Sequence, residues 1–188
     1  MEPDASGNRT PGVIHIDDGL KLHPVSLDDA AELFTAIHRN RARLRQWLPW
    51  VSEHYAFHDA LRFLEEKVAE NARGHALTMV IRSNGQLCGA IGLHRIDVPN
   101  RASSIGYWLD ASFEGQGIMT RACQAIVDTG FRHYLLHRIE IRCATGNHRS
   151  SAIARRLGFV EEGVLRESEW LYDRWVDLRV FSTLQHGG

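Results

Sequence analysis

A glycine-bearing segment near the middle of the chain carries the clearest chemical signal. Residues 107–120 read Tyr-Trp-Leu-Asp-Ala-Ser-Phe-Glu-Gly-Gln-Gly-Ile-Met-Thr, which predicts a strand, a tight turn and then a helix. Gly115 and Gly117 let the backbone approach a ligand closely, and the first turn of the new helix offers N–H groups that have no intrahelical partner. Such a turn binds phosphate without basic side chains. The alternative is a turn that only starts the helix.

Two common phosphate motifs do not fit this segment. A P-loop requires Gly-Lys-Ser/Thr, whereas Gly117 is followed by Ile118 and Met119. The dinucleotide fingerprint requires a third glycine where Thr120 stands, and no βαβ unit opens the chain. A nucleotide-dependent enzyme built on this loop would therefore lack its lysine, and the segment predicts a phosphate site of another kind.

Eleven histidines and three cysteines raise the question of a metal site or of disulfides. The two histidine pairs at i,i+4 spacing, His54/His58 and His133/His137, have no Asp, Glu or Cys placed as a third ligand, so no metal is predicted. The cysteines are odd in number, widely spaced and set among apolar residues, which argues against a disulfide framework and favours a reducing cytoplasm. Cys143 lies on an apolar strand face and is typical of an inert core cysteine.

The elements that must position these residues follow from hydrophobic periodicity. Helices are predicted from Ser26 as N-cap, in a short second helix that ends near residues 48–49, over 58–71, from 117 onward and from 147 to 157. Strands are predicted at 20–25, 77–81, 87–97, 105–109, 139–143, 164–170 and 175–184. An antiparallel meander followed by strand–helix–strand–helix–strand implies an α/β (α+β) fold. Its sheet is mixed, twisted and mostly antiparallel, with about seven strands and one parallel crossover.

Composition limits the classes of protein to which the chain can belong. The chain has 188 residues, 44% of them hydrophobic, and 22 Lys+Arg against 23 Asp+Glu. This balance argues against the broad basic surface of a nucleic-acid binder. No apolar run suggests a membrane span and no signal peptide is visible. We expect a disordered tail over residues 1–12 and a single domain over 13–188.

Here a family resemblance becomes specific. Residues 114–119 resemble the acetyl-coenzyme A pyrophosphate loop of the GNAT N-acetyltransferase superfamily, Gln/Arg-x-x-Gly-x-Gly/Ala. Glu114 stands at the Gln/Arg position and Met119 at the final Gly/Ala. Both departures look like the Rim-type branch, the N-terminal acetyltransferases of ribosomal proteins. Residues 20–22, 28–30, 40–50, 105–109, 147–151 and 157–159 resemble other motifs of that branch in the same order.

The resemblance implies the acyl-CoA N-acyltransferase fold, whose sheet is splayed between the fourth and fifth strands, and acetyl-CoA as co-substrate. Backbone groups around Leu109 would contact pantetheine and the thioester, and Asn147 would hydrogen-bond the pantetheine arm or serve only as a helix N-cap. The cofactor loop would comprise Glu114, Gly115, Gln116, Gly117, Ile118, Met119 and Thr120. Trp47, Trp50 and Tyr172 would bind the acceptor, and the two tryptophans could equally pack their own helix.

The same resemblance suggests the catalytic groups. Many members of the superfamily carry a tyrosine as general acid where this chain has Ala154. In the Rim-type branch Ser150 is the substitute, unless it is an ordinary exposed hydroxyl. Glu169 would be the base, with Trp170, Tyr172 and Trp175 walling a cleft that desolvates it, unless it is a solvated strand glutamate. Direct transfer in a ternary complex needs no cysteine nucleophile.

The sequence thus resembles that of an acetyl-CoA-dependent N-acetyltransferase, and we expect the protein in the cytoplasm. Its expected acceptor is the α-amino group of a protein, of the ribosomal-protein type. A small amine (a polyamine, an amino sugar or an aminoacyl compound) and a non-catalytic acetyl-CoA sensor remain alternatives. Relatives often pair, so a homodimer is also considered, with no nucleic acid and no membrane as direct partners.

Overall fold

The computed structural model describes residues 10–185, and its strands form one eight-stranded sheet in the order β1-β2-β3-β4-β5-β6-β8-β7. The strands are β1 (Ile14–His15), β2 (Leu20–Pro24), β3 (Leu77–Ser83), β4 (Gln86–Asp97), β5 (Ala102–Leu109), β6 (Arg138–Ala144), β7 (Val160–Leu171) and β8 (Arg174–Leu184). The β5–β6 pair is parallel and the other neighbours are antiparallel. The mixed, mostly antiparallel sheet is therefore confirmed, with the short β1 as an extra strand. Residues 1–9 of the expected tail lie outside the described residues.

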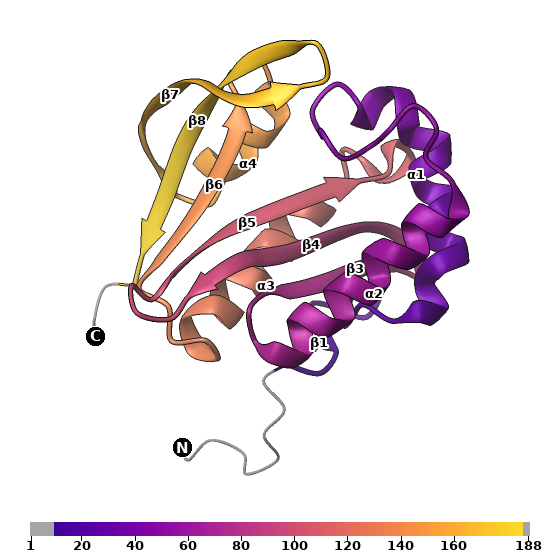
Figure 1. Ribbon diagram of the computed structural model, residues 1–188. Helices are drawn as coiled ribbons and strands as arrows, with labels where there is room; N and C mark the ends of the chain where they lie inside the picture. Colours follow the sequence, from indigo (N-terminus) through magenta and orange to yellow (C-terminus); the bar gives the residue numbers. More distant parts are fainter. Residues whose placement is uncertain (1–9, 186–188) are drawn as a thin grey trace.

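Within residues 10–185, four α-helices cover the sheet, two on each face (Figure 1). They are α1 (Ala30–Leu44), α2 (Phe57–Arg73), α3 (Ile118–Arg132) and α4 (His148–Arg156), with short 3₁₀ turns η1 (Leu27–Asp29) and η2 (Ala111–Phe113). Side chains of a strand alternate between faces, so β5 feeds both cores. Ile105 packs in the cluster of α3 and α4, whereas Trp108 packs in that of α1 and α2.

The segment after α1 differs from the expectation. No separate second helix precedes residues 48–49; α1 is continuous to Leu44 and is followed by turns. The backbone N–H groups of Trp47 and Leu48 still bond to the Leu44 carbonyl. Pro49 then ends the helical pattern, because proline has no N–H and disfavours helical backbone in the residue before it. The result is an irregular connection, residues 45–56, that leads to α2.

The sheet opens between β5 and β6. These strands pair only from Ala102–Arg138 to Ile105–Ile141. Beyond that point β5 continues to Leu109 and β6 to Ala144, but these two strands no longer pair with each other. Their ribbons diverge in Figure 1. The expected splay is confirmed; it falls between the fifth and sixth strands because β1 adds one to the count. The backbone edge of β5 past Ile105 is thereby left open to other partners.

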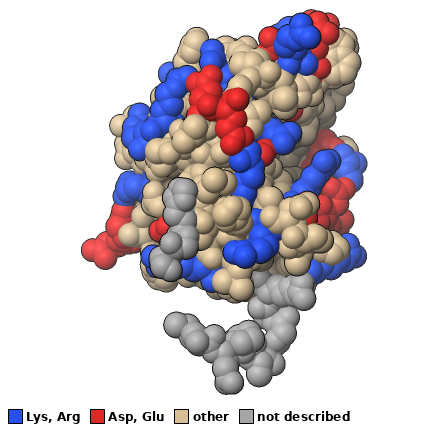
Figure 2. Space-filling view, turned by 90° about the vertical axis from the view of Figure 1, so that its left-hand side faces the viewer, with Lys and Arg blue, Asp and Glu red and all other residues tan. Residues whose placement is uncertain are grey.

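The far edge of the sheet is β7. Figure 2 looks onto this side of the molecule and shows basic and acidic side chains interleaved. Glu161 pairs with both Arg155 and Arg179, and Arg138 pairs with Glu162. Charged side chains of this kind discourage edge-to-edge pairing. Among residues 10–185, no helix is both long enough and apolar enough to cross a membrane.

Candidate functional site

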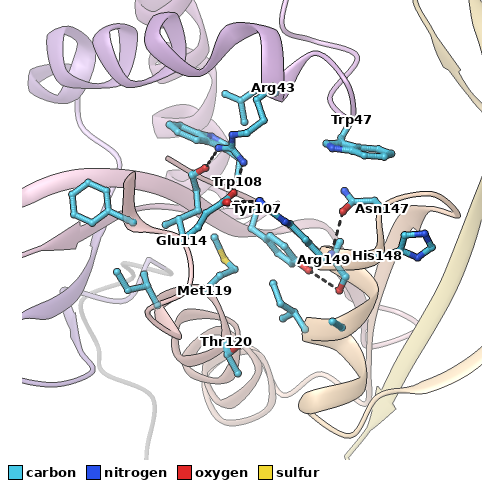
Figure 3. A pocket seen from close by; sticks show the side chains of 18 of the residues that line it. Arg43, Trp47, Tyr107, Trp108, Glu114, Met119, Thr120, Asn147, His148 and Arg149 are labelled. Carbon is cyan, nitrogen blue, oxygen red and sulfur yellow. Dashed lines mark hydrogen bonds and ion pairs between the residues drawn. The ribbon is translucent and has the colours of Figure 1, made fainter. Parts of the chain in front are cut away.

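A cleft of about 1160 Å³ lies where the splay meets the N-terminal ends of α3 and α4 (Figure 3). Its floor and walls come from the end of β5, residues 113–121, residues 146–156 and the last turn of α1 with the residues that follow it. Elements far apart in the sequence therefore converge on one elongated space, which the predicted phosphate loop borders.

The glycine loop has the conformation that the sequence predicts. Gly115 and Gly117 have φ of 75° and 70°, which L-residues with a Cβ rarely adopt. A Cβ at either glycine would meet nothing within 4 Å, so the need for glycine is one of backbone conformation. Gly117 is the N-cap of α3 and gives no side-chain cap. The first N–H groups of α3 are consequently available to an anion at the cleft.

The open edge of β5 ends at a positively charged group. The Leu109 carbonyl accepts a hydrogen bond from the Arg43 guanidinium of α1. Arg43 also donates to Asn40 Oδ1 at 3.2 Å, and Asn40 Oδ1 accepts from the N–H of Ala111 at 2.9 Å. The side chains of α1 thus fix the backbone just past the strand end, where the resemblance expects the thioester.

Glu114 joins two arginines across the cleft. Its carboxylate accepts from Arg43 on one side and from Arg149 of α4 on the other, as the dashed lines in Figure 3 indicate. Sequence reasoning placed Glu114 in the cofactor loop, as a departure from the loop pattern, and did not identify either arginine as its partner. Their partners lie 71 and 35 residues away, so local spacing gave no signal.

Three arginines border the cleft near the glycine loop and α4: Arg121, Arg149 and Arg156. Arg156 donates to the Thr120 hydroxyl at 2.8 Å, and Arg121 pairs with Asp17. A nearly neutral net charge is compatible with such a local group. The sequence analysis did not single out these arginines, because their positions in the first turn of α3 and along α4 are ordinary for surface residues.

Asn147 and Ser150 open α4. Asn147 Oδ1 accepts from the Ser150 N–H at 3.1 Å, so Asn147 is an N-cap, and it also lines the cleft. The Ser150 hydroxyl lies 2.8 Å from the hydroxyl of Tyr107 on β5. Burial raises the pKa of Tyr107, so this phenol stays protonated near neutrality. Ala154, one turn further, is fully buried.

The three aromatic residues expected at the acceptor side separate in space. Trp47 lines the cleft and lies beside Gly146, where a Cβ would be 3.6 Å from the indole. Trp50 does not line the cleft; its ring stacks on Phe63 of α2 at 6.2 Å. Tyr172 does not line it either, and donates from its hydroxyl to the carbonyls of Leu48 (2.5 Å) and Val51 (2.8 Å).

Tyr172 therefore ties the β7–β8 hairpin to the segment after α1. The guanidinium of Arg45 lies 4.2 Å above its ring, and burial raises the pKa of the phenol. The contact holds the hairpin tip close to the segment that carries Trp47. Its effect on an acceptor would be indirect, through the position of these two elements.

Glu169 lies near this hairpin tip, outside the cleft lining. It pairs with Val176, and Leu178, on the same face of β8, pairs with Ala144. This face is opposite to Phe181, which packs in the α3 and α4 core. Glu169 consequently faces the α1 and α2 side of the sheet. Desolvation raises the pKa of its carboxyl, as expected for a half-buried acid.

The tryptophan wall expected around Glu169 is wrong. Trp170 and Trp175 pair across the hairpin with ring centroids 5.2 Å apart, and both are about half exposed. Because successive residues of a strand point to opposite faces, Trp170 cannot share the face of Glu169.

The thiols and histidines form no second site within residues 10–185. Cys88, Cys123 and Cys143 are free and buried, and burial raises the pKa of Cys88 to about 11. Cys143 Sγ lies 3.4 Å from Ser151 Oγ in the core and does not line the cleft. No group of three or more His, Cys, Asp or Glu in this part of the chain could hold a metal ion.

Comparison with known proteins identifies the family and agrees with the fold. The family model of the GNAT acetyltransferase domain matches residues 20–160. The chain belongs to this family, and it is therefore an acetyltransferase that uses acetyl-CoA. Over 171 residues it is 32% identical to the ribosomal-protein-serine acetyltransferase of Escherichia coli K12, covering 91% of this chain and 96% of that protein.

Solved structures show the same fold with ligands. The microcin C7 self-immunity acetyltransferase MccE, in complex with acetyl-CoA and AMP, has a TM-score of 0.89 at 30% identity, covering 94% of this chain and 98% of its own. RimL, a ribosomal L7/L12 α-N-protein acetyltransferase in complex with coenzyme A, has a TM-score of 0.88 at 28% identity, covering 92% and 97%.

Proposed function

We propose that the protein transfers the acetyl group of acetyl-CoA to the N-terminal α-amino group of a protein, of the ribosomal-protein type. The similarity to a ribosomal-protein-serine acetyltransferase over nearly both full lengths supports this acceptor. The observation that carries the proposal is Glu169: a half-buried carboxylate, with its pKa raised by desolvation, on the sheet face opposite α3 and α4.

Acetyl-CoA would lie along the cleft with its phosphates at the α3 end. The first N–H groups of α3, at Ile118, Met119 and Thr120, would bind the pyrophosphate, and Gly115, Gln116 and Gly117 would shape that turn. Pantetheine would enter the splay and pair with the open edge of β5 at Leu109. Asn147 would contact the pantetheine arm while capping α4. The cleft volume and the positive-φ glycines support this fit.

An α-amine acceptor needs only weak assistance from a general base to lose its proton. An α-amino group with a pKa near 8 is about 10% uncharged at pH 7, whereas lysine, near 10.4, is only about 0.04% uncharged. A carboxylate with a moderately raised pKa can accept the proton that the amine loses as it attacks the thioester. Glu169 would take this role, directly or through water, and Ser150 would hydrogen-bond the departing thiolate.

The acceptor would enter between the β7–β8 hairpin and the segment after α1. Trp47 borders the cleft on this side, and Tyr172 holds the hairpin against the segment. Trp50 would contribute through the packing of α2 rather than by contact. A homodimer and a cytoplasmic location stay predictions.

Thiol release from acetyl-CoA tests the proposal, with peptides that begin in Ser or Ala, N-terminally blocked Lys peptides, spermidine, an amino sugar and an aminoacyl compound as acceptors. Glu169→Gln is run beside Glu167→Gln, a matched control on the same strand whose side chain is exposed. We expect turnover of peptide α-amines that falls about 100-fold in Glu169→Gln alone. Preference for spermidine, the amino sugar or the aminoacyl compound would assign the small-molecule alternative, and preference for the blocked Lys peptides would contradict the α-amine acceptor. Cofactor binding without turnover of any acceptor would favour the sensor.

A further inference from the structure

The hydroxyl of Tyr107 is a half-buried polar group at the cleft that the proposed function does not use. Tyr107 projects from β5 into the core of α3 and α4 and borders the cleft. Its oxygen lies 2.8 Å from Ser150 Oγ, the optimum for a hydrogen bond between hydroxyls. Because β5 and β6 no longer pair at this level, the contact bridges the splay from β5 to α4, next to the path expected for pantetheine (Figure 3).

The direction of this hydrogen bond follows from the partners that each hydroxyl has. Within residues 10–185, Tyr107 Oη contacts only Ser150: its hydroxyl oxygen, and its backbone carbonyl at 3.4 Å. If Ser150 donated, the phenol proton would have only the Ser150 carbonyl, at 3.4 Å, as its acceptor among the described residues, which is the weaker arrangement. If Tyr107 donates, the Ser150 proton is free to point into the cleft. The second arrangement satisfies both groups once a ligand is bound.

We propose that Tyr107 is a positioning residue for the leaving group: it donates to Ser150 Oγ, so that the Ser150 hydroxyl points at the sulfur of coenzyme A and stabilises the thiolate. In this step the acceptor nitrogen forms a bond to the acetyl carbon, the C–S bond breaks and its electron pair stays on sulfur. No proton has to leave Tyr107. The thiolate accepts the Ser150 hydrogen bond and is protonated by water after release.

The proposal explains two features together. Ala154 leaves the helix without the tyrosine that many relatives carry at this position, and it is fully buried. A phenol from β5 instead reaches the same helix one turn earlier, where Ser150 alone would be a weak donor. Hydrogen bonds in a chain polarise one another, so Tyr107 makes the Ser150 hydroxyl a stronger donor to sulfur than it would be by itself.

A binding experiment tests this step without any acceptor, although the proposal rests on the proposed placement of the cofactor. Affinities for coenzyme A and for desulfo-coenzyme A, which lacks the thiol, are measured by calorimetry between pH 6 and about 9.5. A cysteine thiol titrates near pH 8.5, and the alkyl thiol of coenzyme A titrates somewhat higher, so the upper part of this range contains the thiolate. If its thiolate is hydrogen-bonded in the complex, coenzyme A gains affinity over the desulfo analogue as the pH rises. We expect this gain in the wild type and its loss in both Tyr107→Phe and Ser150→Ala.

Turnover measurements are the second part of this test. With any amine that the wild type acetylates, Tyr107→Phe should lower kcat about tenfold, the value of one such hydrogen bond, at an unchanged KM for acetyl-CoA. In the Ser150→Ala background it should have no further effect. Tyr55→Phe is the matched control, since its buried hydroxyl has no hydrogen-bond partner among residues 10–185.

Each outcome decides the question. A pH-dependent gain that survives in Tyr107→Phe, or a kcat loss of equal size in both Ser150 backgrounds, would overturn the proposal. If the wild type acetylates no α-amine but its coenzyme A affinity still follows pH through Tyr107 and Ser150, the proposed acceptor is wrong and the positioning role holds. Melting temperatures that match the wild type ensure that a loss is not one of folding.

Discussion

Glu114 offers the sharpest test of how the cleft is charged. Its carboxylate pairs with Arg149, at the end of the cleft where the phosphates of acetyl-CoA are expected, and with Arg43 beside Leu109. The loop pattern of the superfamily has a neutral or basic residue at this position. Glu114→Gln keeps the shape of the side chain and removes the negative charge. We expect this variant to bind acetyl-CoA more tightly than the wild type and to be slightly less stable.

The magnitudes follow from the two ion pairs. The Glu114 side chain is 27% exposed, that of Arg43 32% and that of Arg149 77%. Pairs this exposed contribute little, so their loss costs about 1 kcal/mol in total, or about 2–4 °C in Tm for a chain of this size. An arginine released to a phosphate gains a charge-assisted hydrogen bond of about 1.5 kcal/mol. The Kd for coenzyme A should therefore fall about tenfold at low salt.

Calorimetric titration of coenzyme A at low ionic strength and at about 0.5 M salt measures the gain in affinity and the part of it that salt screens. Glu161→Gln is the matched control, because Glu161 also joins two arginines, Arg155 and Arg179, but outside the cleft lining. It should leave the Kd unchanged. Weaker binding by Glu114→Gln, with a normal control, would refute the reasoning and show that Glu114 positions the arginines for the ligand rather than competing with it.

Other substitutions separate structural from functional roles. Tyr55→Phe removes a buried hydroxyl that lacks a partner within the described chain, so urea unfolding should show a gain of about 1 kcal/mol; a loss would mean that the hydroxyl is satisfied. Glu169→Gln should raise stability at pH 7, because the folded state disfavours the charged carboxyl, whose pKa is raised. The gain should vanish below about pH 4, where the wild-type acid is neutral in both states. Gly117→Ala forces a Cβ into φ of 70° and should cost about 1–2 kcal/mol, with a higher KM for acetyl-CoA; an unchanged KM would separate the turn from the cofactor. Tyr172→Phe loses two hydrogen bonds and should raise the KM for the acceptor while that for acetyl-CoA stays constant.

The sequence predicted those parts of the fold that depend on local pattern. The glycine loop, the Asn147 cap and the succession of strands along the chain follow from residue types at short spacing, and the structure confirms them. The continuous α1 was missed because the apolar residues of 44–50 fit a helix as well as a turn. Pro49 decides between them through its missing N–H.

The site was predicted less completely, for a physical reason. Arg43, Arg149 and Tyr107 acquire their roles only through partners more than 30 residues away, and a one-dimensional pattern carries no trace of such contacts. Trp170 shows the opposite error. Because Trp170 follows Glu169 in the sequence, it was predicted to line the same cleft, but the two side chains point to opposite faces of their strand.

The two sheet faces suggest how donor and acceptor can meet without a covalent enzyme intermediate. Tyr107 and the first turn of α4 lie on the α3 and α4 side, whereas Glu169 faces the α1 and α2 side. A thioester threaded through the splay would expose its sulfur to the first face and its carbonyl carbon to an amine arriving from the second. The thiolate and the amine proton then leave in opposite directions. Direct transfer of this kind requires both substrates to be bound at once, so desulfo-coenzyme A should compete with acetyl-CoA but not with the acceptor.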